Sequence, residues 1–211
     1  VNIPSQADKT GDIDMLTIIK AYLKEKYNKP GNVYLGLVHR LDRPVGGVMV
    51  FAKTSKSAGR LSNQVREKQF QKTYLVIVNG KMENQKGTLQ DYLLKNEKTN
   101  ISKVVKEGTK NSKLAILDYE VLKYDKELNL SVLKINLHTG RHHQIRVQLS
   151  SRNHSIYGDQ KYAGRGHGKQ IALWAYNLKF YHPISNELME FEAMPEMIGS
   201  WAILKENCNI S

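Results

Sequence analysis

Residues 70–80, FQKTYLVIVNG, form the clearest β-strand pattern in the sequence. Aromatic and β-branched side chains dominate this stretch, and both kinds are enriched in strands. In an extended chain the apolar residues divide between two faces, Tyr74, Val76 and Val78 on one and Leu75 and Ile77 on the other. The stretch therefore predicts a β-strand and places a sheet in the fold.

More strands are expected on both sides of this one. Short apolar segments separated by turn residues occur at 48–51, 87–94, 101–105, 114–124, 128–137, 171–180 and 188–193. Asp125-Lys126-Glu127 is a suitable hairpin connection between two of these segments. Because strands and helices do not alternate strictly, we expect an α+β fold with a mixed, mostly antiparallel sheet.

Helices are predicted to flank this sheet. Their expected ranges are 14–27, 55–68, 141–151 and a C-terminal stretch from about residue 196. Ser55 or Ser57 is the expected cap of the second helix, and Thr139 is the expected cap of the third. Ile145 and Leu149 stand four residues apart, which is the spacing of one helix face.

Net charge is the strongest signal in the composition of the 211 residues. Lys and Arg number 32 against 20 Asp and Glu, which gives a formal charge of +12 at pH 7. A surplus of this size indicates a polyanionic partner, usually nucleic acid. A basic protein without such a partner is the alternative. The length and the 40% of hydrophobic residues fit one globular domain over residues 1–211.

Several classes of protein are not favoured by the composition. No apolar run approaches the ~18–20 residues that a membrane span requires, so no membrane is expected. The single cysteine, Cys208, cannot form an intrachain disulfide, which fits a reducing cytoplasm. The seven histidines are scattered without metal-ligand spacing, so no metal is predicted.

One acid stands between two arginines in residues 38–54, VHRLDRPVGGVMVFAKT. The guanidinium groups of Arg40 and Arg43 favour the ionised form of Asp42. Such a carboxylate can act as a nucleophile or as a base towards a sugar carbon. A surface ion pair is the alternative. The glycine pair at 46–47 lets another backbone or a ligand approach closely, or simply forms a turn.

A second basic motif, HTGRHHQIRV, occupies residues 138–147. Arg141 would lie in the first turn of the predicted helix, where a phosphate could bind. Arg146 could face the same cleft, although a solvated basic helix explains the pattern as well. A metal site at His142 and His143 is not expected, because adjacent helix positions point in different directions.

Tyrosines accompany both motifs. Tyr74 on a strand is more often a core aromatic residue than a catalyst. Tyr157 and Tyr162 flank Gly158-Asp159 and could stack on a base or simply pack. A basic, glycine-rich loop is expected at 158–170, and its part from 162 to 170 is expected to contribute to specificity.

Together these motifs resemble those of the RluA-type pseudouridine synthases. In chain order they are HRLD at 39–42 followed by Gly47 and an apolar strand, KTY at 72–74, TGRHHQIR at 139–146, YGDQKY at 157–162, and Tyr181-His-Pro. The order and intervals also match, and the resemblance covers about residues 8–195. HRLD in combination with TGR-x-HQIR is its most specific part.

The resemblance implies a pseudouridine synthase fold with a central RNA-binding cleft. It also implies an RNA isomerase that breaks the N1–C1′ bond of a uridine, turns the uracil and rejoins it through C5. The RNA would be structured, either rRNA or tRNA, and the uridine would have to leave its stack. Because isomerisation consumes neither water nor a redox equivalent, no cofactor is expected.

The resemblance also assigns roles to individual residues. It makes Asp42 the catalytic residue, paired with Arg146, and stacks Tyr74 against the target base. Whether Asp42 attacks C1′ or removes the C2′ proton stays open. Arg40 would fill the gap that the flipped nucleotide leaves. The other residues expected to bind RNA are Arg43, Arg141, His143, Gln144 and Tyr162.

Three positions depart from the family pattern. Residues 45–46 are Val-Gly where Thr-Ser or Thr-Ala is frequent, Gln148 stands where His is frequent, and 173–175 are Leu-Trp-Ala instead of Leu-His-Ala. The first departure supports one alternative, a non-catalytic RNA-binding or assembly factor. A ribonuclease that uses His39 or His143 is a weaker one, because nothing in the sequence pairs two histidines at one phosphate.

The N-terminal part of the family pattern has no counterpart before Asp42. Neither an accessory RNA-binding domain nor the usual first strand is visible there, so a shortened N-terminus is expected. Nothing in the sequence demands more than a monomer.

Overall fold

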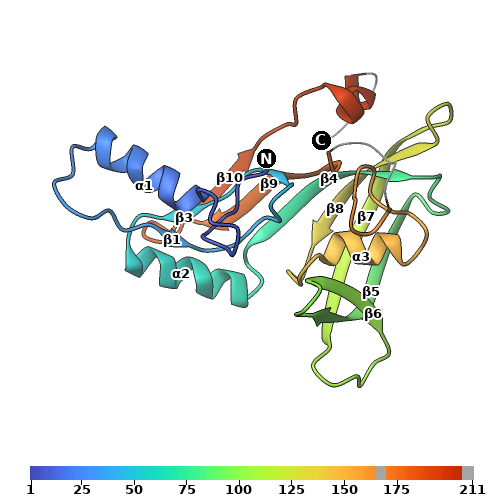
Figure 1. Cartoon of the computed structure of the whole chain (residues 1–211), viewed down its shortest axis with the longest axis horizontal. Coiled ribbons are helices and arrows are strands. Elements are labelled where there is room, and N and C mark those ends of the chain that lie inside the picture. Colours follow the sequence, from blue (N-terminus) through green and yellow to red (C-terminus); the bar gives the residue numbers. More distant parts are fainter. Residues whose placement is uncertain (165–169, 206–211) are drawn as a thin grey trace.

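The computed structural model describes residues 1–164 and 170–205 of the chain. Most of its strands form one eight-stranded sheet (Figure 1). In sheet order these strands are β10 (Leu188–Glu192), β9 (Leu173–Tyr181), β4 (Gln71–Asn79), β8 (Leu130–Leu137), β7 (Lys113–Asp125), β5 (Lys86–Asn96) and β6 (Ile101–Val105), with β2 (Gly46–Gly47) beside β9. Every pairing is antiparallel except that of β2 with β9. The predicted mixed, mostly antiparallel sheet is confirmed.

Strand β4 lies at the centre of the hydrophobic core. It pairs with β8 on one side and with β9 on the other. Residues 75–78 are completely buried, because both faces of this strand are apolar and both are covered. The helix α3 (Gln144–Ser150) and the 3-10 helix η1 (Gly199–Lys205) pack against this core through Leu149 and Trp201.

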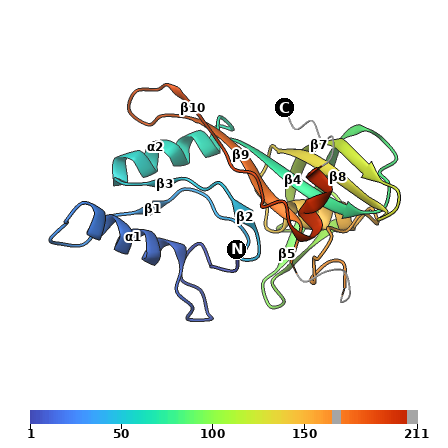
Figure 2. The same ribbon diagram turned by 90° about the horizontal axis from the view of Figure 1, so that it is seen from above.

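A smaller unit lies beside the β9–β10 end of the sheet (Figure 2). It contains the two-stranded sheet of β1 (Gly36–Leu37) and β3 (Phe51–Ala52), together with α1 (Met15–Lys26) and α2 (Ser55–Arg66). Leu61 of α2 packs with Ala52 and with Leu178 of β9, which joins this unit to the large sheet. Strands β5 and β6 lie at the opposite end of the molecule (Figures 1 and 2).

Two predictions near the HRLD motif are corrected. The strand expected at 48–51 does not form as predicted: β2 ends before it at Gly47, and β3 includes only its last residue, Phe51. The glycines pair with β9, so a strand forms at 46–47, earlier in the chain than predicted. No local sequence pattern indicates that partner. The cap of α2 is Thr54, whose hydroxyl accepts the Ser57 N–H, and not Ser55 or Ser57.

The third helix is shorter than predicted. α3 begins at Gln144 because His143 has a left-handed backbone with φ of 53°, which interrupts a helix. Arg141 therefore lies in the preceding loop and not in a first helical turn. Thr139 is not the cap, since its hydroxyl accepts the Ile116 N–H of β7. Ile145 and Leu149 are both buried, as their spacing predicts.

The C-terminal helix starts later than expected, at Gly199, and is of the 3-10 type. Residues 165–169 of the glycine-rich loop and Cys208 lie outside the described residues. Within residues 1–164 and 170–205, no helix is long and apolar enough to cross a membrane.

Candidate active site

The loop between β1 and β2 carries Asp42, and two glycines hold this loop against the large sheet. Gly47 has a φ of +121°, and a Cβ atom there would lie 2.1 Å from the carbonyl oxygen of Ala175. A Cβ atom on Gly46 would lie 2.3 Å from the indole ring of Trp174. The close approach expected of the glycine pair is therefore confirmed, and the neighbour is the backbone of β9.

Asp42 forms an ion pair with Arg146. Nη1 of Arg146 donates to Oδ2 of Asp42 at 3.1 Å, and the two residues are 104 positions apart in the chain. Oδ1 of Asp42 has no hydrogen-bond partner among the described residues. The carboxylate is therefore held through one oxygen, while the other is free for a ligand.

Arg146 is itself fixed by a second carboxylate. Its Nε and Nη2 donate to the two carboxylate oxygens of Asp159 at 2.8 and 2.7 Å, and its side chain is 5% exposed. Burial opposes the charge, but the hydrogen bonds with Asp159 and the nearby Asp42 outweigh it and raise the pKa of Arg146. A bidentate pair of this kind sets both the charge and the orientation of the guanidinium group.

Asp159 is a site residue that sequence reasoning did not assign. It is 1% exposed and also accepts the backbone N–H groups of Lys161 and Tyr162. The only sequence feature that could have indicated it is an acid that follows a glycine in YGDQKY. In the structure Gly158 has a φ of +75°. The glycine in this motif indicates a turn, but only the folded structure shows that Asp159 pairs with Arg146.

Tyr74 lies on β4, next to the Asp42 loop. It is paired with Ile135 of β8 and Ala175 of β9 and is 7% exposed. Burial, and secondarily the charge of Asp42, raise the pKa of its hydroxyl above the ordinary value. The phenol is therefore neutral near pH 7. The structure brings Asp42, Tyr74 and Arg146 together, as the resemblance implied.

Two histidines and a tyrosine form a cluster beside Asp42. Nε2 of His143 lies 3.7 Å from Oδ2 of Asp42, and Nδ1 of His143 lies 2.9 Å from the hydroxyl of Tyr162. The guanidinium carbon Cζ of Arg146 lies over the ring of Tyr162, 5.2 Å from the ring centroid. Nδ1 of His142 contacts the hydroxyl of Ser102 at 2.9 Å.

The expectation that His142 and His143 point apart is wrong. Their rings stack with centroids 3.7 Å apart, because both residues lie in the loop before α3 and not in a helix. The ordinary helical geometry therefore does not apply to them. Within the described part of the chain, no group of three or more His, Cys, Asp or Glu residues could hold a metal ion.

Gln144 and Arg141 support the loop that carries this cluster. Gln144 is buried, donates to the carbonyl of Ile116 at 3.0 Å and accepts the Arg141 N–H at 3.0 Å. Nε of Arg141 donates to the carbonyl of Leu114 at 2.8 Å, although the residue is exposed. Both side chains thus tie the TGRHHQIR loop to β7.

The two arginines beside Asp42 have different surroundings. Arg43 binds the N-terminal segment through the carbonyl of Asn2, the hydroxyl of Thr10 and the carboxylate of Asp12. Arg40 is exposed and forms no ion pair within the described residues. Of the two, Arg40 has the guanidinium group that is available to a ligand.

His39 and Lys72 are further basic groups near the site. Nε2 of His39 accepts the Val50 N–H at 3.1 Å, while its Nδ1 is buried without a partner among the described residues. Burial, and secondarily the charge of Lys72, lower the pKa of His39 to about 4. His39 is therefore neutral near pH 7. Burial also lowers the pKa of Lys72.

The residues that depart from the family pattern form specific contacts in the structure. Gln148 is fully buried and donates to Asp91 at 2.7 Å, which connects α3 with β5. Trp174 donates to the carbonyl of Ala193 at 2.7 Å and covers Gly46. The indole occupies the space that a side chain at 46 would need, so glycine fits at 46 beside Trp174.

Comparisons with known proteins identify the family of the chain. The sequence pattern of the family described as RNA pseudouridylate synthase matches residues 4–151. An uncharacterized RNA pseudouridine synthase of Aquifex aeolicus is 35% identical over 167 residues, which cover 74% of this chain and 52% of the relative. Ribosomal large subunit pseudouridine synthase C of Haemophilus influenzae is 32% identical, with 78% of this chain and 53% of the relative covered. The chain thus spans about half the length of these curated relatives.

A solved structure has the same fold. Human RNA pseudouridylate synthase domain containing 4 superimposes with a TM-score of 0.76, covering 93% of this chain and 83% of that chain at 20% identity. The family pattern covers well over half of the sequence, and the β1–β2 loop, β4 and α3 bring Asp42, Tyr74 and Arg146 to one place. The chain therefore belongs to the RNA pseudouridylate synthase family.

Proposed function

We propose that the chain isomerises uridine to pseudouridine in RNA, with Asp42 as the catalytic carboxylate. The observation that carries this proposal is the way in which the carboxylate is held. Oδ2 is bound by Arg146, whereas Oδ1 has no partner among the described residues. A carboxylate that is fixed through one oxygen keeps the lone pairs of the other for a reacting atom.

The reaction conserves every atom of the substrate. The N1–C1′ bond breaks, the uracil turns, and a C5–C1′ bond forms, while C5 loses a proton and N1 gains one. Asp42 acts on the sugar, either by attack at C1′ or by removal of the C2′ proton. Both roles need the ionised carboxylate, and Arg146 is the buried cation that pairs with it through Oδ2.

Tyr74 provides an aromatic surface below the reacting base. Its raised pKa keeps the phenol protonated near neutral pH, so it does not act as a base there. Its position beside Asp42 supports a stacking role for the ring and a hydrogen-bond donor role for the hydroxyl. Arg40, which is exposed in the same loop as Asp42, is suited to fill the gap in the base stack.

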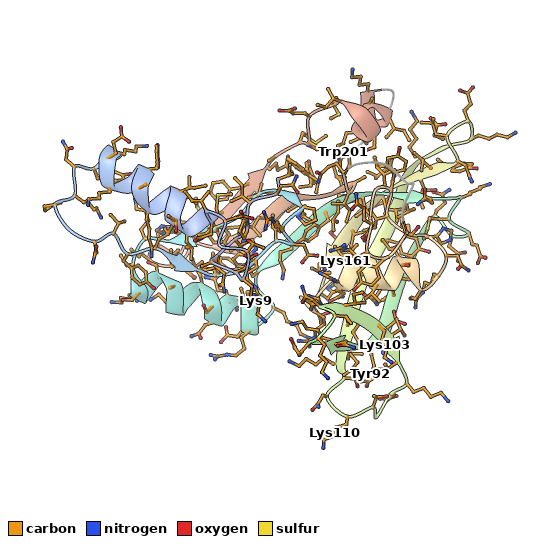
Figure 3. All side chains as sticks on the ribbon, viewed as in Figure 1. Lys9, Tyr92, Lys103, Lys110, Lys161 and Trp201 are labelled. Carbon is orange, nitrogen blue, oxygen red and sulfur yellow. The ribbon has the colours of Figure 1, made fainter. Side chains whose placement is uncertain are left out.

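Exposed lysines on the β5–β6–β7 end of the molecule extend this site. We call Lys98, Lys103, Lys106, Lys110 and Lys113 the lysine arm; all five are exposed, and none forms an ion pair within the described residues. Lys161, Lys103 and Lys110 lie along this end in Figure 3. Ser102 of β6 contacts His142, so the arm adjoins the catalytic cluster. Phosphates flanking the target uridine would bind there.

The substrate proposed here is rRNA of the large subunit, because relatives such as synthase C of Haemophilus influenzae are named for it. All residues of the site belong to one chain, which supports a monomer. Action on ribosomal RNA would place the protein in the cytoplasm. The test is incubation of the recombinant protein with unmodified large-subunit rRNA and, in parallel, tRNA, followed by chemical labelling that maps pseudouridine. New pseudouridine in rRNA is expected, and no product from any RNA would contradict the proposal.

A non-catalytic RNA-binding factor is less well supported. Its only sequence support was the change at 45–46, and Gly46 has a packing reason because Trp174 covers it. Such a factor would bind rRNA with strong salt dependence but would yield no labelled product.

A further inference from the structure

A chain of polar contacts runs from β6 to the carboxylate of Asp42. The backbone N–H of Ser102 donates to the hydroxyl of Tyr162 at 2.8 Å. That hydroxyl lies 2.9 Å from Nδ1 of His143, and Nε2 of His143 lies 3.7 Å from Oδ2 of Asp42. Ser102 and Tyr162, which are distant from Asp42 in the sequence, are therefore linked to one oxygen of the catalytic carboxylate through His143.

Counting protons along this chain favours one tautomer of His143. The Tyr162 hydroxyl has one proton and already accepts the Ser102 N–H, so its own proton is directed to Nδ1 of His143. Burial raises the pKa of Tyr162, which keeps that proton on the hydroxyl. Because Nδ1 is then the acceptor, the imidazole proton of neutral His143 is on Nε2. The Nε2–H group faces Asp42.

The surroundings of His143 favour this neutral form. Burial lowers its pKa to about 3, against the opposing effect of Asp42 from the β1–β2 loop. The positive charges of Arg146, on α3, and Lys161, in the loop that follows α3, act in the same direction as burial. The adjacent His142 also lowers it and stacks on the ring at 3.7 Å, which fixes the ring plane.

We propose that His143 is a positioning residue that donates its Nε2–H to Oδ2 of Asp42 beside Arg146, and that Tyr162 sets the required tautomer. The present separation of 3.7 Å is longer than a hydrogen bond. Contacts of this kind often shorten when substrate closes the site. With two donors on Oδ2, Oδ1 is the oxygen that reacts. This inference rests on the proposed function for its catalytic consequence, but the tautomer itself does not.

The tautomer is measured directly by long-range ¹H–¹⁵N NMR of the full chain with ¹⁵N-labelled histidine. The His143 signals are assigned from their loss in His143→Gln. The expected pattern is a protonated Nε2 and an unprotonated Nδ1, unchanged from about pH 8 to about pH 5. In Tyr162→Phe, a mixture of both tautomers is expected. A protonated Nδ1 or a doubly protonated ring at neutral pH in the wild type would overturn the inference.

Kinetics test the catalytic consequence. His143→Phe keeps an aromatic ring but removes the donor, and Tyr162→Phe removes only one hydroxyl. Each should lower kcat about tenfold with little change in KM, since one hydrogen bond to the carboxylate is lost or weakened. His143→Gln, whose amide can donate, should retain more activity than His143→Phe.

Ser150→Ala is the matched control, because the Ser150 hydroxyl donates only to the carbonyl of Tyr162. Its kcat should equal that of the wild type. Circular dichroism identifies any variant that is not folded, and Tyr162→Phe changes the fewest contacts. Equal kcat in wild type, His143→Phe and Tyr162→Phe would refute the positioning role. If neither the wild type nor any variant forms pseudouridine, the proposed function is wrong. The NMR measurement still tests the tautomer of His143 in that case.

Discussion

Gly46→Ala is expected to destabilise the protein, although such a change usually stabilises one. Gly46 has an ordinary backbone conformation that alanine can adopt, so the only obstacle is space. The new Cβ atom would lie 2.3 Å from Cζ3 and 2.9 Å from Cε3 of Trp174. The indole cannot move freely, because its N–H donates to the carbonyl of Ala193 at 2.7 Å.

The magnitude follows from these two contacts. Overpacking costs about 1–3 kcal/mol and loss of the indole hydrogen bond about 1 kcal/mol, so the free energy of unfolding should fall by about 2–4 kcal/mol. Trp174→His removes the six-membered ring that clashes. Only the side chain of Val1, 2.9 Å from the new Cβ atom, then remains close. The double variant should therefore be nearly as stable as Trp174→His alone, with a coupling energy of about 2–4 kcal/mol.

Urea denaturation followed by far-ultraviolet circular dichroism measures all four proteins of this cycle. Gly59→Ala is the matched control, because Gly59 lies within α2 and its added Cβ would meet nothing within 4 Å. This control should gain up to about 1 kcal/mol. A stable Gly46→Ala protein, or a double variant in which the two losses simply add, would refute the idea that residues 46 and 174 depend on each other.

Three further results are expected. Asp159→Asn leaves Arg146 with one carboxylate fewer, so the free energy of unfolding should fall by about 3–5 kcal/mol in urea denaturation; a smaller loss than that of the surface variant Asp125→Asn would contradict the buried pair. His39 has a pKa of about 4 when folded against an ordinary 6.5, so the unfolded chain binds more protons between these values. Stability should thus fall by on the order of 3 kcal/mol as pH decreases from 6.5 to 4, and His39→Gln should flatten this dependence. Lys103→Gln/Lys106→Gln in the lysine arm should weaken RNA binding and reduce the slope of log K against log salt by up to about 2. Lys81→Gln/Lys126→Gln, which changes exposed lysines in the β4–β5 loop and the β7–β8 turn, should not.

The sequence patterns predicted an element correctly where its own residues, and not a distant partner, determine its structure. The β4 strand appeared because apolar residues occupy both of its faces, and α2 appeared because Leu61 and Val65 share a helix face. Boundaries set by distant partners were not predictable. Strand β2 exists because its glycines fit against Trp174 and Ala175, which lie more than a hundred residues later.

In the candidate active site, too, the residues in motifs were predictable and the contacts between distant segments were not. Asp42, Tyr74 and Arg146 were identified through motifs, yet their meeting depends on the crossing of β4, α3 and the β1–β2 loop. Asp159 was missed because an acid in a turn has many roles, and its pairing with Arg146 is a tertiary contact. The left-handed backbone of His143, which shortens α3 and stacks the two histidines, has no clear sequence signal either.

The central claim is that the ionised carboxylate of Asp42 performs the chemistry and does not merely hold RNA. Asp42→Asn keeps the size of the side chain but removes its charge. Single-turnover formation of pseudouridine in large-subunit rRNA is measured for wild type and Asp42→Asn, with RNA affinity determined on the same samples. Product formation should be abolished while affinity changes little. An Asp42→Asn protein that forms pseudouridine at the wild-type rate would contradict the account.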